Sequence, residues 1–123
     1  MRPESRVLLI DVREAARFIA DDTANATYEA FVADQRMRQA VLYSFLVIGE
    51  ALNRIHRRDP DLAQRTSDIG DVVAMRNVVI HGYDIVDFAI VWRAVQEKLP
   101  ALALQIEEML LEDEQEYPGL EAT

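Results

Sequence analysis

Residues 34–58 read DQRMRQAVLYSFLVIGEALNRIHRR, and this stretch decides the fold class. Its apolar positions alternate spacings of four and three residues, which is the pattern of a helix packed lengthwise on another helix. These positions are Val41, Phe45, Ile48, Leu52 and Ile55. Asp59-Pro60 follows, and a residue before proline disfavours the α conformation. We therefore expect a helix from about Asp34 to Arg58, roughly 37 Å long at 1.5 Å per residue.

The segments on either side of this helix also show a helical pattern. A first helix is expected after Ser5, with Leu8, Val12, Ala15 and Ile19 on one face. Residues 21–27 and 61–70 are polar connections, and a short helical turn is expected from Tyr28 to Val32. A third helix would run from about residue 72 to Gly82, after which Asp84 could cap a new one.

The series from residue 88 to residue 109 keeps the same rhythm through Pro100, where either a new helix or a kink is expected. No segment alternates like a strand. The sequence predicts an all-α protein, an antiparallel bundle of about four to five helices. We expect one domain over residues 1–123, with an acidic tail frayed from about residue 112.

Composition excludes several classes of protein. The chain has 123 residues and no cysteine, so it can form neither a disulfide nor a thiolate metal site. No apolar run approaches the roughly 18 residues of a membrane span, and the first residues are charged, so we expect a cytoplasmic protein without a signal peptide. The net charge of −9 argues against general affinity for nucleic acid.

The positive charges are unevenly distributed, however. Several arginines fall in the middle of the chain, whereas residues 107–116 carry acidic side chains and no basic one. Either a locally basic surface or an ordinary solvated face would account for them. These arginines are Arg36, Arg38, Arg54, Arg57, Arg58, Arg65 and Arg76.

The segment MRNVVIHGYD, residues 75–84, carries the most concentrated chemistry. Asn77 and His81 are four residues apart and share a helix face. Arg76 and His81 are five apart, about 140° around a regular helix, so one unbroken helix would not direct both at one atom. Either Gly82 releases His81 from helical geometry, or two copies of the segment face each other in a dimer.

Arginine and histidine together suit the cleavage of RNA by its own 2′-hydroxyl. The arginine fork matches phosphate oxygens, and histidine exchanges protons near neutral pH. No cluster of His, Asp and Glu has the spacing of a metal site, so neither a metal nor another cofactor is expected. The other histidine, His56, lies among arginines and is expected to be exposed.

These residues resemble a known motif. Arg76-Asn77, His81 and Tyr83 match the Arg-x4-His-x-Tyr motif of the HEPN superfamily, and within it the HepT-like toxins. The sequence Ile-Gly-Glu-Ala at 48–51, Trp92 and Leu99-Pro100 are also similar to HepT-like sequences.

The resemblance implies a homodimeric, metal-independent endoribonuclease toxin with both motifs lining a cleft between the subunits. It also implies a cognate nucleotidyltransferase antitoxin that transfers AMP to Tyr83. On this reading His81 is the general acid and base, Arg76 stabilises the phosphate and the transition state, and Asn77 orients the groups.

Other interpretations of these residues stay open. Arg76 could pair with Glu50 across helices, Asn77 could fix the loop after the helix, and Tyr83 could simply pack. The chain as a whole could instead be a non-catalytic helical module that dimerises and holds a nucleotide or a nucleotidyltransferase. A purely structural bundle is a third interpretation, which the polar segment disfavours.

Overall fold

The computed structural model describes residues 1–65 and 86–116, and all the regular structure in these ranges is helical. The elements are α1 (Pro3–Thr23), α2 (Tyr28–Ala33), α3 (Gln35–Arg58), α4 (Pro60–Ala63), α6 (Phe88–Arg93), the π-helical segment η2 (Ala94–Lys98) and α7 (Leu99–Glu116). The expected all-α class is confirmed.

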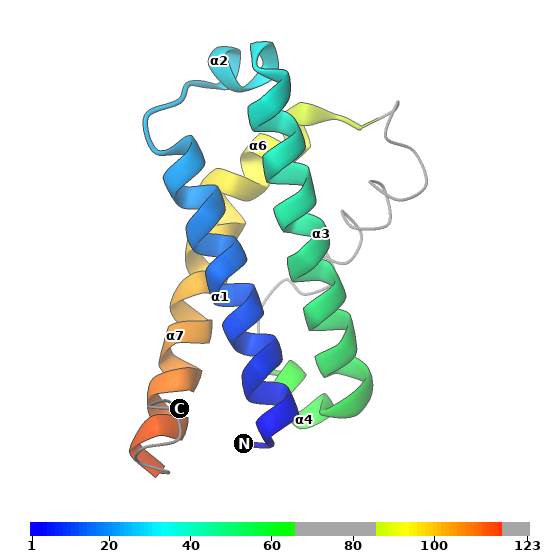
Figure 1. The fold of residues 1–123 in the computed structure, drawn as a ribbon, viewed down its shortest axis with the longest axis vertical. Coiled ribbons are helices and arrows are strands. Elements are labelled where there is room, and N and C mark those ends of the chain that lie inside the picture. The colour runs from blue at the N-terminus through cyan, green and yellow to red at the C-terminus, as the bar shows by residue number, and fades with distance from the viewer. Residues whose placement is uncertain (66–85, 117–123) are drawn as a thin grey trace.

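Three long helices lie along the longest axis of the molecule (Figure 1). α1 packs against both α3 and α7 and runs antiparallel to them. The short helices close the ends: α2 contacts α3 and α6 at one end, and α4 follows α3 at the other. The expected antiparallel bundle is therefore confirmed.

α1 and α3 contribute much of the hydrophobic core. All five apolar positions that define the expected face of α3 are at most 1% exposed. On α1 the buried face is turned slightly from the expected one, because Leu9 and Ala16 are buried while Leu8 and Ala15 are partly exposed at its edge. Gly49, next to Ile48 on α3, is also buried.

The start of α1 differs from the prediction. The helix begins at Pro3, a favoured first helical residue, with Arg2 preceding it. Ser5 is therefore not the cap but a buried residue inside the helix. Its hydroxyl donates a hydrogen bond of 2.9 Å to the Asp59 carboxylate, which ties the start of α1 to the end of α3. α1 also continues to Thr23, into the expected connection.

The boundaries of α3 agree with the sequence. The Asp34 side chain accepts a hydrogen bond of 3.1 Å from the Met37 amide and caps the first turn. The helix ends at Arg58, immediately before Asp59-Pro60. Pro60 then opens the short helix α4, so the expected connection is helical in its first residues.

The chain stays helical from α6 through η2 into α7, which contains Pro100, and its course bends between α6 and α7 (Figure 1). The Leu99 amide bonds to the Ala94 carbonyl five residues earlier, which is the π-helical spacing. Such a wider turn gives space for a proline ring that would otherwise meet the carbonyl four residues before it. Of the two expected solutions, the structure adopts the kink.

The acidic end of α7 is ordered further than expected. α7 continues to Glu116, although acidic groups near a helix C-terminus oppose the helix dipole. Ion pairs offset this cost: Asp113 is buried against Arg6, and Glu112 binds Arg65 at 2.6 Å. The prediction of fraying from residue 112 was thus wrong for residues 112–116.

Candidate functional site

The candidate catalytic residues lie outside the described residues. Arg76, Asn77, His81 and Tyr83 all fall within positions 66–85, as does the third expected helix. Their roles and the Arg76–Glu50 alternative therefore stay predictions. The described residues show how the two ends of this segment are held.

The chain leaves the described region at Arg65, beside α4. The Arg65 guanidinium binds Glu112 of α7, and its amide donates to the Leu62 carbonyl at 3.0 Å. The chain resumes at Val86, which packs against the core two residues before α6, the helix that contacts α2 at that end of the bundle. The segment with the motif therefore connects opposite ends of the bundle, with both attachment points fixed by packing or ion pairs.

An aromatic cluster holds the start of α6, directly after the motif segment. The Phe31 ring centre lies 5.1 Å from that of Trp92 and 6.1 Å from that of Phe88. The Arg38 guanidinium lies 5.3 Å from the centre of the Phe88 ring, a cation–π distance. Asp87 caps α6 by accepting from the Ala89 amide at 2.9 Å. These contacts hold α6 in place, and the preceding segment is joined to α6.

A buried ion pair joins the beginning and the end of the described chain. Arg6 Nη1 of α1 lies 2.6 Å from Asp113 Oδ2 of α7, and the amino group of Met1 lies 3.2 Å from Asp113 Oδ1. Both side chains are at least nine-tenths buried. The sequence analysis missed this pair, because its partners are 107 residues apart and each looks like a surface charge.

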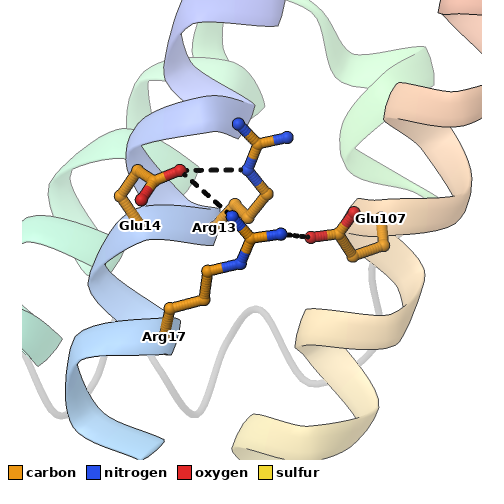
Figure 2. Close-up of polar contacts among 4 residues, drawn as sticks. All are labelled: Arg13, Glu14, Arg17 and Glu107. Atoms are coloured by element: carbon orange, nitrogen blue, oxygen red, sulfur yellow. Dashed lines mark hydrogen bonds and ion pairs between the residues drawn. The ribbon is translucent and has the colours of Figure 1, made fainter. Parts of the chain in front are cut away.

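A second set of ion pairs on α1 lies at the surface and has a structural role. Arg17 binds Glu107 of α7 at 2.8 Å and Glu14 of its own helix at 3.5 Å, while Arg13 contacts the same Glu14 oxygen (Figure 2). Exposed pairs of this kind stabilise a fold by at most about 1 kcal/mol each. The group links α1 to α7.

An apolar groove of about 600 Å³ lies between α1 and α3. Phe18 and Tyr43 border it and are 53% and 67% exposed. Large aromatic side chains this exposed are typical of contact surfaces. Their exposure could have been predicted from the sequence, since both aromatic residues lie outside the apolar face of their helices.

The C-terminal end of α3 is basic. Arg54, Arg57 and Arg58 are exposed there, and Arg2 Nη1 donates a hydrogen bond of 2.8 Å to the Arg58 carbonyl. We call these four residues the basic end of α3. His56 lies among them and is exposed, as the sequence predicts.

In the ranges 1–65 and 86–116, no group of three or more His, Asp or Glu side chains could hold a metal ion. Within the same ranges, no helix is both long and apolar enough to cross a membrane.

Comparison with known proteins agrees with this helical architecture. The family model described as "Ribonuclease HepT-like" matches residues 12–109. "Putative RNase MJ1380" of Methanocaldococcus jannaschii is 27% identical over 104 residues, covering 83% of this chain and 93% of that protein. "Probable ribonuclease HepT" of Thermococcus cleftensis is 29% identical over 113 residues, covering 89% and 98%. No solved structure matches the chain.

Proposed function

The chain belongs to the HepT-like ribonuclease family, and on that premise we propose that it is a metal-independent endoribonuclease, the toxin of a toxin–antitoxin pair. One observation carries the proposal: Arg76, Asn77, His81 and Tyr83 occur in motif spacing inside the stretch that the family model matches. The relatives named as ribonucleases align over most of their own length, which supports a shared activity.

The proposed reaction is attack of the RNA 2′-hydroxyl on its own phosphate. His81 removes the proton of that hydroxyl, and the 2′-oxygen forms a bond to phosphorus. The bond from phosphorus to the 5′-oxygen of the next nucleotide breaks, and a proton passes to this leaving oxygen. The products are a 2′,3′-cyclic phosphate and a 5′-hydroxyl.

Arg76 is proposed to stabilise the phosphate during this step. Its guanidinium stays charged at all relevant pH values and can hold two phosphate oxygens at once. Negative charge builds up on these oxygens as the new bond forms, so the interaction is stronger in the transition state than in the bound substrate. Asn77 shares a helix face with His81 and would orient it or the scissile phosphate.

The experiment that tests this function is incubation of the purified protein with cellular RNA, with and without EDTA. Cleavage in both reactions supports the proposal. RNA that stays intact under conditions in which the protein is folded favours the non-catalytic binding module instead.

We also propose that the active form is a homodimer with two motif segments at a shared cleft. The 140° offset between Arg76 and His81 in a regular helix supports this, since the partner could supply the missing group. The exposed Phe18 and Tyr43 beside the α1/α3 groove provide apolar surface for self-association. Analytical ultracentrifugation at micromolar concentration should show a dimer, and a monomer there would contradict the proposal.

The proposed partner is a nucleotidyltransferase antitoxin that modifies Tyr83. The phenolic oxygen would form a bond to the α-phosphorus of ATP and release pyrophosphate. Tyr83 follows Arg76 by seven residues, nearly two turns of a regular helix, so the added phosphate could bind Arg76. The phosphate on the modified Tyr83 would then bind the Arg76 guanidinium, which the RNA substrate needs.

The variant Tyr83→Phe should therefore cleave RNA at close to the normal rate but resist its antitoxin. Co-expression of each form with the nucleotidyltransferase, followed by intact mass measurement, tests this. The protein with the natural Tyr83 should gain the mass of one adenylate, and the Tyr83→Phe variant should gain none. An adenylate on another residue, or normal neutralisation of the variant, would remove the regulatory role of Tyr83.

A further inference from the structure

The basic end of α3 concentrates positive charge on a chain whose net charge is −9. Arg54, Arg57 and Arg58 are spaced three and four residues apart from Arg54, so they project from one side of the helix. Arg2 joins them through its bond to the Arg58 carbonyl. These four arginines thus come from the end of α3 that leads into α4 and from the N-terminus, which lies at the same end of the bundle (Figure 1).

Internal ion pairing does not account for these arginines. Other exposed arginines do pair: Arg17 binds Glu107, and Arg65 binds Glu112. In the described part of the chain, Arg54, Arg57 and Arg58 form no such pair. The neighbouring Asp59 uses its carboxylate for the Ser5 hydroxyl and the Leu62 amide, at 2.9 and 3.4 Å.

The helix dipole explains only part of the pattern. The helix dipole attracts cations to a helix C-terminus, and this favours basic residues in the last turn of α3. Arg54 lies a full turn before Arg58, however, and Arg2 comes from a different segment. The dipole therefore does not account for all four arginines.

We propose that the basic end of α3 binds the sugar–phosphate backbone of single-stranded RNA outside the catalytic motif. This inference rests on the proposed function. Arginine forks match phosphate oxygens, and on a protein that repels RNA overall a local positive region would determine where the strand binds. Arg54 to Arg58 rises only about 6 Å along the helix, which fits a phosphate or two rather than the long footprint of a duplex reader.

A matched pair of variants tests this surface. Arg57→Gln with Arg58→Gln removes two charges from the basic end, and Arg36→Gln with Arg93→Gln removes two exposed charges from the α2 end. Binding of a short fluorescent unstructured RNA is measured by anisotropy, with His81→Ala present in every protein to prevent cleavage. Thermal unfolding of each variant confirms that it is folded.

The first variant should bind RNA on the order of tenfold more weakly, with a log–log salt slope shallower by about 1.4, because single strands contribute about 0.7 per neutralised phosphate. The control should stay within about twofold, since it removes the same net charge from a surface that RNA does not contact. With His81 intact, the first variant should raise KM and leave kcat unchanged.

Equal effects of the two variants would overturn the inference, because net charge alone would then explain RNA binding. Weakened binding of the antitoxin with unchanged RNA binding would also overturn it and assign the surface to an acidic protein. If the protein binds RNA at this surface but never cleaves it, only the proposed ribonuclease function fails. If it neither binds nor cleaves RNA, both fail.

Discussion

Replacing His81 with alanine is expected to slow RNA cleavage by about 10²–10⁴-fold, the usual contribution of a general acid or base. The alanine side chain can neither accept the proton of the 2′-hydroxyl nor return one to the leaving oxygen. RNA binding should change little, so the loss should appear in kcat. Single-turnover cleavage of a labelled RNA measures this directly.

His56→Ala is the matched control, because His56 is the only other histidine in the chain and is exposed at the end of α3. Its replacement should leave the rate unchanged within about twofold, as expected for a surface residue. Equal rates for His81→Ala and the unmodified protein would show that the motif histidine does not transfer the proton.

Replacing Asp113 with alanine is expected to lower the free energy of unfolding by about 3–5 kcal/mol. The substitution leaves the buried Arg6 guanidinium without the carboxylate that binds it at 2.6 Å. The Met1 amino group, 3.2 Å from the same carboxylate, loses it as well. Removing one member of a buried charged cluster is costly because the remaining charges stay desolvated. Urea unfolding followed by circular dichroism provides the measurement.

Glu112→Ala is the control for this prediction, one residue away on the same helix. Glu112 binds Arg65 in an exposed pair, so its loss should cost at most about 1 kcal/mol. A double variant, Arg6→Met with Asp113→Leu, should recover part of the stability, since apolar residues can replace a buried pair at little cost while the Met1 amino group still loses Asp113. Similar losses for Asp113→Ala and Glu112→Ala would show that burial does not govern this pair.

The long helices could be predicted because their periodicity is local. The five apolar positions of α3 and those from Val95 to Met109 follow the 3.6-residue repeat and are buried. Phe88 and Trp92, which begin the second series, are only partly buried. Asp34 and Asp59-Pro60 fixed the ends of α3 for similarly local reasons.

The errors arose where distant residues decide the local structure. Ser5 resembles a helix cap, but it lies inside α1 with its hydroxyl on Asp59, 54 residues away. Residues 112–116 resemble a frayed acidic tail, but Asp113 and Glu112 find cations at Arg6 and Arg65. Helical periodicity cannot predict these pairs, because they form only when α1, α4 and α7 come together.

For the candidate site, the sequence predicted the type of reaction, and the structure showed the helices on either side of the motif segment. The motif from Arg76 to Tyr83 indicated the reaction from residue types and spacing alone, whereas its position between α4 and α6 required the fold. The ring contacts of Phe31 with Phe88 and Trp92 were not predicted, since ring contacts between helices depend on how the helices pack.

The central claim is that this chain cleaves RNA through the 2′-hydroxyl without a metal ion. The most direct measurement is the end chemistry of the products after cleavage in excess EDTA, determined by mass spectrometry. The account predicts undiminished cleavage with 2′,3′-cyclic phosphates, or the 3′-phosphates formed when they open, and 5′-hydroxyls. Products with a 3′-hydroxyl, or cleavage that EDTA abolishes, would contradict it.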